Sequence, residues 1–109
     1  MVTDVYREKD KMISIKVYKQ GDDIMIGACD EKLIGKKFKD GKFQIDVSRT
    51  FYGGKLISSE KLERYLEDAT IANLVGEETV KCAIKLGLID PSCILKIKGI
   101  PHAQMIRML

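Results

Sequence analysis

The fold of this chain is decided first by residues 12–29, which read MISIKVYKQGDDIMIGAC. On both sides of the central Gly-Asp-Asp, apolar residues alternate with other side chains, and a period of two is typical of a half-buried strand. Gly21 can adopt the positive φ that a tight turn requires. This stretch therefore predicts a β-hairpin at the start of an antiparallel sheet.

Further strand patterns extend that sheet. Residues 43–47 alternate again, directly after the Asp-Gly pair at residues 40–41, which is a hairpin turn signal. Residues 94–100 are typical of a strand with one interruption, at Gly99. Residues 103–109 predict a short final strand.

One helical turn and a first helix are predicted between these strands. The turn covers residues 30–35, and we expect Asp30 to cap it and Gly35 to end it. Ser58 or Ser59 caps the helix that follows. The apolar face of this helix consists of Leu62, Tyr65, Leu66 and Ala69.

A second helical pattern covers residues 70–86, where apolar residues recur at mixed spacings of three and four. Thr70 is a candidate cap at its start, and Gly87 ends it. Gly76 stands in the middle, where a glycine costs about 1 kcal/mol relative to alanine. We therefore expect either two short helices that meet at Gly76 or one helix that is kinked there.

Together these elements predict an α+β fold. It is a two-layer sandwich with a small, largely antiparallel sheet and two or three helices on one face. The length of 109 residues suits a single domain. Residues 12–109 are expected to form this domain, and residues 1–11, which show no periodicity, are interpreted as a flexible lead-in.

Composition excludes several classes of protein. With 45% hydrophobic and 32% charged residues, the chain is too apolar to be disordered. No apolar run approaches the roughly 20 residues that a membrane span needs. The polar amino terminus is unlike a secretory signal. We therefore expect a cytoplasmic protein.

The cysteines favour the same compartment. Cys29, Cys82 and Cys93 are widely spaced, and His102 is the single histidine. A disulfide framework or a structural zinc site needs more ligands at closer spacing. We expect three reduced thiols and neither a metal nor another cofactor. One disulfide with one thiol left over is the alternative.

Positive charge is concentrated in residues 32–42. Five lysines and one acid give this stretch a net charge of +4, against +3 for the whole chain. Lysines in such a run contact the phosphates of nucleic acids, or they form a solvated surface turn. Phe38, Phe51 and Tyr52 are available to stack on bases. The lysines are Lys32, Lys36, Lys37, Lys39 and Lys42.

Cys29 and Asp30 suggest a second kind of site. A thiol, an imidazole from His102 and a carboxamide from Asn73 or Gln104 are the groups of a cysteine-nucleophile site. The structural interpretation is stronger, because cysteine is often buried as a small apolar residue and Asp30 serves as a helix cap.

Three other stretches break local rules. Phe51-Tyr52-Gly53-Gly54 predicts a tight, specific bend. Residues 99–102, Gly-Ile-Pro-His, predict a rigid loop whose histidine either is a functional group or holds the loop closed, and the structural role is the stronger interpretation. Residues 73–76 place an asparagine and a glycine inside the predicted helix, which is typical either of a functional site or of close packing.

Four blocks of sequence resemble one family. They are ACDEKLIG at 28–35, FYGG at 51–54, ATIANLVGE at 69–77 and GIPHAQ at 99–104. In this order they are similar to the archaeal "domain of unknown function" family number four hundred and twenty-four, over residues 12–104. The resemblance implies a small archaeal α+β domain in a translation-related setting, without an assigned activity, cofactor or substrate. The matching motif positions are Cys29, Asp30, Gly35, Phe51, Tyr52, Gly53, Asn73, Gly76, Pro101 and His102.

Three functions follow as hypotheses. The first is a non-enzymatic module that binds RNA or a ribonucleoprotein, with the five lysines on phosphates and Tyr52 and His102 nearby. The second is a small-molecule binding protein or enzyme, with a pocket near Cys29, Asp30, Asn73 and His102. The third is a protein–protein adaptor that uses the bend at residues 51–54.

Overall fold

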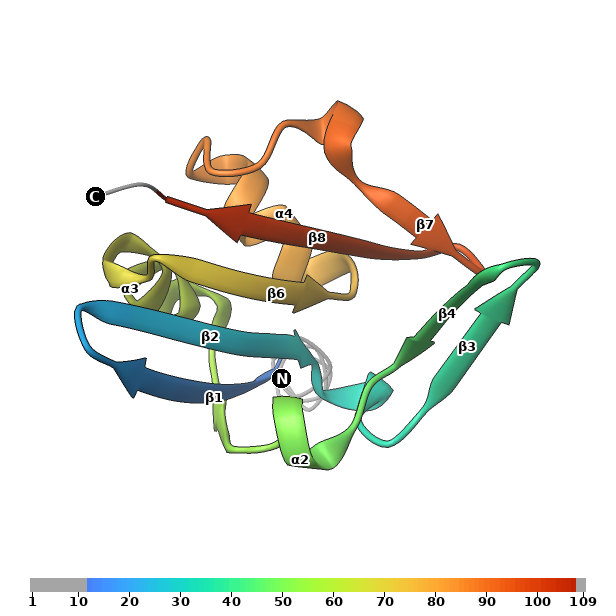
Figure 1. Cartoon of the computed structure of the whole chain (residues 1–109), viewed down its shortest axis with the longest axis horizontal. Helices are drawn as coiled ribbons and strands as arrows, with labels where there is room; N and C mark the ends of the chain where they lie inside the picture. Colours follow the sequence, from blue (N-terminus) through green and yellow to red (C-terminus); the bar gives the residue numbers. More distant parts are fainter. Residues whose placement is uncertain (1–11, 108–109) are drawn as a thin grey trace, which may run out of the picture.

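The computed structural model describes residues 12–107, which form a six-stranded sheet and a separate two-stranded ribbon (Figure 1). The strand order in the sheet is β5-β1-β2-β6-β8-β7. Neighbours are antiparallel except for β2 and β6, which are parallel. The strands of the sheet are β1 (Ile13–Gln20), β2 (Asp23–Asp30), β5 (Lys55–Ile57), β6 (Ile71–Val75), β7 (Leu95–Ile97) and β8 (Ile100–Ile106). The predicted lead-in, residues 1–11, lies outside the described residues.

Two helices, α3 (Ser59–Asp68) and α4 (Glu77–Lys85), cover one face of the sheet (Figure 1). Between them and the sheet lies the main apolar core, because every second residue of the central strands points to this side. The predicted α+β class, with a largely antiparallel sheet and helices on one face, is confirmed. The fully buried residues of the main apolar core include Ile13, Ile15, Ile26, Leu62, Leu66 and Leu74.

The opposite face, which we call the open face, is covered only at one end. There it carries the short helix α2 (Arg49–Tyr52) and the ribbon, which consists of β3 (Lys37–Asp40) and β4 (Phe43–Asp46). These elements enclose a second apolar cluster against the sheet. Its buried members are Cys29, Leu33, Ile45, Val47, Tyr52, Val75 and Ile97.

Several local predictions are confirmed. Residues 12–29 form the hairpin of β1 and β2, and Gly21 takes a φ of 61° in its turn. Of the two serines considered as caps, Ser58 caps α3, because its hydroxyl accepts a hydrogen bond from the Lys61 N–H at 3.2 Å. The predicted hairpin turn after Asp40 forms at residues 41–42, one position later than the Asp-Gly pair, and joins two strands that carry Lys37 and Lys39 on the first of them.

The predicted helix over residues 70–86 is wrong in its first half. Residues 71–75 form β6, which lies between β2 and β8 in the middle of the sheet. Its first four residues alternate between half-buried and buried, but Ile71 and Val75 place apolar side chains on the open face as well, so only Asn73 marks the polar side of the strand in the sequence. Gly76, with a φ of 107°, is the junction at which β6 ends and α4 begins. Thr70 does not cap a helix, since its hydroxyl accepts from the Ile24 N–H at 2.9 Å.

The carboxyl-terminal strands also differ from the prediction. A short helical turn, η2 (Pro91–Cys93), precedes β7. The final strand β8 begins at Ile100, so that Pro101 and His102 belong to a strand rather than to a rigid loop. The interruption at Gly99 is a tight turn between β7 and β8, with a φ of 77°.

Candidate functional site

The five predicted lysines all lie along the ribbon or at its base, and all are exposed. Phe38 and Ile45 pair across the ribbon and pack against the second apolar cluster. Since side chains alternate along a strand, Lys37 and Lys39 point away from that cluster into solvent. The ribbon therefore turns its apolar face to the protein and its basic face outward.

The tip of the ribbon lies against the turn between β7 and β8. The carboxylate of Asp40 accepts a hydrogen bond from the Lys98 backbone N–H at 3.2 Å. This contact brings the exposed residue Lys98 to the tip. Sequence reasoning missed it, because 58 residues separate Asp40 from its partner.

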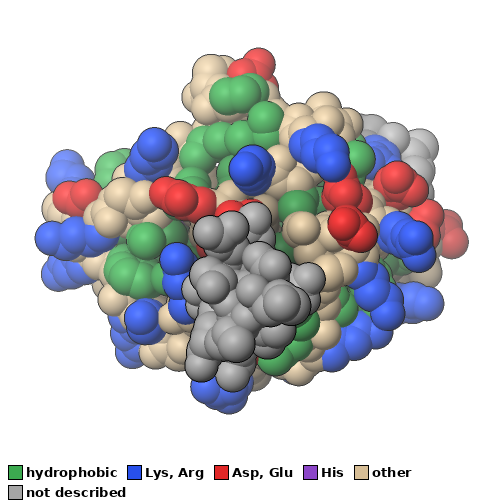
Figure 2. Space-filling view, turned by 180° about the vertical axis from the view of Figure 1, so that it is seen from behind, with side chains coloured by type: hydrophobic (Ala, Val, Ile, Leu, Met, Phe, Trp, Pro, Cys, Tyr) green, Lys and Arg blue, Asp and Glu red, His purple; other side chains and the backbone are tan. Residues whose placement is uncertain are grey.

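The helix face has a different charge pattern. Figure 2 shows Lys and Arg side chains interspersed with Asp and Glu over this side of the molecule. One such pair is Lys85 with Glu63, at 3.1 Å. The excess of positive charge is thus a property of the ribbon, as the net charge of residues 32–42 predicts.

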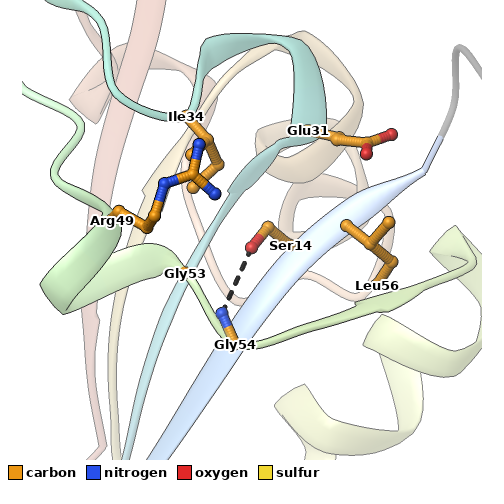
Figure 3. Close-up of a pocket in the computed structure, with 7 residues that line it drawn as sticks. All are labelled: Ser14, Glu31, Ile34, Arg49, Gly53, Gly54 and Leu56. Carbon is orange, nitrogen blue, oxygen red and sulfur yellow. Dashed lines mark hydrogen bonds between the residues drawn. The ribbon is translucent and has the colours of Figure 1, made fainter.

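A pocket of about 500 Å³ opens at the base of the ribbon (Figure 3). Two of its charged side chains, Arg49 and Glu31, stand on opposite sides of it and do not point toward each other. Among residues 12–107, Arg49 has no acidic partner. The backbone of Val47, two residues before it, is bonded to that of Lys36 at 2.9 Å. Arg49 thus adds a guanidinium near the basic ribbon.

The predicted residue Gly53 lines this pocket, where its role is structural. A Cβ at residue 53 would lie 2.4 Å from the carbonyl oxygen of Arg49. At Gly54 it would lie 2.1 Å from the carbonyl oxygen of Ile15. The hydroxyl of Ser14 donates to the Tyr52 carbonyl at 2.8 Å and accepts from the Gly54 N–H at 3.5 Å (Figure 3). The two glycines therefore let the chain turn tightly from α2 into β5.

The uncovered part of the open face carries side chains in two cross-strand rows. The strand registers place Gly27 and Asn73 side by side, with Gln104 next. The same registers place Met25 beside Ile71, with Ile106 next. Ile106 is 70% exposed. The complete rows are Lys16, Gly27, Asn73, Gln104 and Tyr18, Met25, Ile71, Ile106.

An aromatic pair stands on the β1–β2 half of this face. The rings of Tyr18 and Phe51 are stacked, with centroids 5.5 Å apart and planes 21° from parallel. One edge of the Phe51 ring lies so close to Gly27 that a Cβ there would be 2.9 Å from it. The Tyr18 hydroxyl donates to the Phe51 carbonyl at 2.8 Å, and the Lys16 ammonium lies 5.5 Å from the Tyr18 ring. The alternation of Ser14, Lys16 and Tyr18 along β1 was the sequence signal for this face.

An amide pair lies on the other half. The side chain of Gln104 donates to the side-chain oxygen of Asn73 at 2.7 Å, from β8 to β6. Asn73 is half-buried and Gln104 is exposed. Asn73 was unfavourable in the predicted helix because it belongs to a strand. In the sequence, its partner Gln104 was marked only as a polar residue between the apolar residues Ala103 and Met105.

Cys29 and Tyr52 are buried in the second apolar cluster beside this face. Burial raises the pKa of the Cys29 thiol to about 12, and the neighbouring Asp30 adds to the effect. Burial likewise raises the pKa of Tyr52 to about 12. A thiol that is protonated at neutral pH and buried under α2 is unsuited to nucleophilic attack. The geometry therefore favours the structural interpretation of Cys29.

Asp30 does not cap the helical turn η1 (Glu31–Leu33) as the sequence led us to expect. Its carboxylate instead accepts hydrogen bonds at the start of α4, from the N–H of Glu78 at 3.2 Å, the N–H of Thr79 at 2.9 Å and the hydroxyl of Thr79 at 2.7 Å. Turn chemistry alone suggested a local cap, but the bonded residues are 48 and 49 positions away. The start of a helix attracts an anion, and at α4 the Asp30 carboxylate of the protein itself is that anion.

Gly76 and Pro101 complete the same junction. The Gly76 N–H donates to the Pro101 carbonyl at 2.9 Å, and its Cα faces the carboxylate of Asp30. Pro101 also lines a second pocket, of about 590 Å³, between α4 and η2. Figure 2 shows apolar side chains at the top of the helix face, where η2 overhangs α4.

His102 lies on the open face, where it pairs with Val75 on β6 and Leu95 on β7. It is half-buried, and burial lowers its pKa. It shares this face with Asn73, whereas Asp30 and Gly76 lie at the start of α4. The structure thus places the four residues of the predicted small-molecule pocket in three surroundings: Cys29 in the second apolar cluster, Asp30 at the start of α4, and Asn73 and His102 on the open face.

Two further findings concern the described residues as a whole. No group of three side chains suited to hold a metal ion occurs within 12–107. No helix in this part of the chain is both long and apolar enough to cross a membrane.

Comparison with known proteins identifies the family. The model of the family described as "Protein of unknown function (DUF424)" matches residues 18–108. This chain belongs to the DUF424 family. The resemblance found in the four sequence blocks is confirmed, because all four blocks lie within the matched residues.

The DUF424 chain is also similar to a solved structure, an uncharacterized conserved protein from the archaeon Methanopyrus kandleri. The two are 23% identical, with a TM-score of 0.70 over 90% of this chain and 96% of the other. At this identity the likeness shows a shared fold. No curated protein matches the chain.

Proposed function

We propose that this protein binds single-stranded RNA across its open face and does not act as an enzyme. One observation carries the proposal: a sheet face with accessible aromatic and amide side chains is bordered by the basic ribbon. Unpaired bases stack on aromatic side chains, and lysines contact the phosphates that link those bases. The setting we propose is cytoplasmic and translation-related.

Charge complementarity selects a nucleic acid over other occupants of this face. Residues 32–42 carry a net charge of +4. The ribbon packs on one end of the open face, beside the uncovered part, and its lysines are exposed. Lys98 and Arg49 extend the basic border at the tip and at the base. A strand of RNA laid over the sheet would therefore meet cations along its backbone.

The flatness of the site selects single strands. Tyr18, Phe51, Asn73 and Gln104 are side chains of a sheet surface and of α2, which rests on it. Bases that are paired inside a duplex cannot present their faces to such side chains. We therefore expect single strands to bind more tightly than duplexes of the same sequence.

The test is fluorescence anisotropy with a labelled 12-nucleotide RNA, as a single strand and as a duplex, at two salt concentrations. The variant combines Lys37→Glu, Lys39→Glu and Lys42→Glu. We expect it to weaken binding at least about tenfold and to reduce the slope of log affinity against log salt by about 2, since each phosphate contact contributes about 0.7 for single strands.

The matched control combines Lys61→Glu, Arg64→Glu and Lys81→Glu, three exposed residues of α3 and α4. It changes the net charge by the same amount on the helix face. The proposal requires this control to bind much more tightly than the ribbon variant. It is overturned if the wild type binds neither RNA, or if both variants weaken binding equally.

A further inference from the structure

The Phe51 ring has two aromatic neighbours on the open face. Tyr18, on β1, stacks on it, and Tyr52 makes a T-shaped contact with it, with ring centroids 4.8 Å apart. The ring stands with its edge toward Gly27 on β2. On the side away from Tyr18, the next strand is β6, where Gly27 pairs with Asn73. A flat ring placed against that side of Phe51 would stand over Asn73 and Gln104.

The absence of a side chain at Gly27 creates this arrangement. Gly27 is buried, and a Cβ there would lie 2.7 Å from the Phe51 carbonyl oxygen and 2.9 Å from its ring. Any other residue would push Phe51 away from the sheet. The bond from the Tyr18 hydroxyl to the Phe51 carbonyl, at 2.8 Å, holds the same segment from the other side. The Phe51 ring is therefore fixed in place before any ligand binds.

The amide pair presents a defined set of hydrogen-bonding groups below that position. Gln104 uses one of its N–H donors on the side-chain oxygen of Asn73, at 2.7 Å. This bond leaves both N–H donors of the Asn73 amide and the side-chain oxygen of Gln104 for a ligand. Because the bond fixes the two amides relative to each other, a donor and an acceptor lie next to each other on the sheet surface.

We propose that Phe51, Asn73 and Gln104 form a binding position for one unpaired adenine. Adenine presents a ring-nitrogen acceptor beside an amino donor, and asparagine and glutamine amides are the side chains that usually read this edge. Uracil lacks the amino donor, and cytosine presents the same two groups on a single, smaller ring. The two fused rings of adenine also give the larger stacking surface against Phe51. Phe51 supplies stacking, and the amide pair supplies the choice of base. This inference rests on the proposed function, because it names the nucleotide that the same face selects.

The test compares labelled rA8, rC8 and rU8 by fluorescence anisotropy, for the wild type and for a double variant with Asn73→Ala and Gln104→Ala. We expect the wild type to bind rA8 at least about fivefold more tightly than the other two. In the double variant this ratio falls below about twofold, while binding to rU8 changes little. Both substituted side chains lie on the surface, so the fold, checked by circular dichroism, is retained.

A matched control and a stacking variant separate the two roles. Gln44→Ala removes an exposed amide of β4, and the adenine preference stays intact. Phe51→Leu weakens binding to all three oligonucleotides by about tenfold, because stacking acts on every base. A preference for cytosine or uracil, or an adenine preference that the double variant retains, overturns the adenine position and leaves RNA binding in place. Failure of the wild type to bind any of the three overturns the proposed function as well.

Discussion

The carboxylate of Asp30 occupies the space in which a side chain at residue 76 would lie. A Cβ on Gly76 would be 2.4 Å from the Asp30 Cγ and 2.6 Å from its Oδ1. With a φ of 107° and a ψ of 154°, Gly76 also has a backbone conformation that is almost restricted to glycine. The glycine is therefore required because it leaves room for an aspartate that caps α4 from a neighbouring strand.

Removal of the Asp30 carboxylate is expected to destabilise the protein. Asp30→Ala leaves two backbone N–H groups and one hydroxyl at the start of α4 without their acceptor. Asp30 is only 2% exposed, so water cannot replace these bonds easily. We expect the free energy of unfolding to fall by about 2–4 kcal/mol, measured by urea denaturation with far-UV circular dichroism.

Asp90 provides the matched control for this measurement. Its carboxylate caps η2 in a similar way, with bonds of 2.9 Å from the Ser92 N–H and 2.8 Å from the Ser92 hydroxyl. Asp90 is exposed, so water takes over after Asp90→Ala and the loss of stability is much smaller. Equal losses in the two variants would show that burial of the Asp30 cap is unimportant.

The three thiols are expected to react at very different rates. Cys93 is exposed, whereas Cys29 and Cys82 are buried, and burial raises their pKa values to about 12 and about 11. Shifts of this size reduce the thiolate fraction by about two to three orders of magnitude. We expect a maleimide reagent at neutral pH to modify one thiol per chain rapidly, and all three only after denaturation.

Cys93→Ser tests the assignment of the reactive thiol. Mass spectrometry should detect almost no rapid modification of the folded variant. Rapid labelling of Cys29 in this variant would contradict the structural interpretation and would restore the cysteine-nucleophile hypothesis.

Stability is expected to depend on pH through His102, the single histidine. Burial lowers the pKa of His102 below its ordinary value, so the folded protein binds this proton more weakly than the unfolded chain does. The unfolded histidine titrates near about 6.5. The stabilising effect is therefore complete above that pH and is lost as the pH falls below it.

The measurement is the free energy of unfolding between pH 7.5 and pH 5.5. In the wild type it should fall with pH by less than about 1.4 kcal/mol per unit, the limit for one proton. In His102→Gln the slope over this range should nearly disappear. A variant with the wild-type slope would assign the effect to other groups.

Local patterns predicted those parts of the fold whose bonds are local. The hairpin of residues 12–29 follows from alternation and a glycine turn, and the Ser58 cap follows from contacts three residues away. The lysines of the ribbon were visible because they are contiguous in sequence. Each of these features depends on residues that are close together along the chain, so a local sequence pattern is enough to predict it.

The strand β6 was misinterpreted as a helix because its surroundings come from distant parts of the chain. Ala72 and Leu74 face α3 and α4, while Val75 packs on the second apolar cluster. Because Ile71 and Val75 are apolar although they lie on the open face, the strand shows little polar alternation, and Leu74 and Val75 recur at helical spacing from Ile71. Asn73 and Gly76, which broke the helical rule, were the only local warning.

The α+β class, the first hairpin, the basic ribbon and membership of the family can all be read from the sequence, because composition, periodicity and motif order are properties of the chain. The roles of the motif residues, in contrast, depend on the folded arrangement. Asp30 caps α4 rather than the turn that follows it, and Asn73 meets Gln104 across two strands. Both outcomes depend on strand order and register, which bring together residues separated by 31 to 49 positions. Those pairings arise from burial of the two apolar clusters, and no local stretch of sequence specifies them.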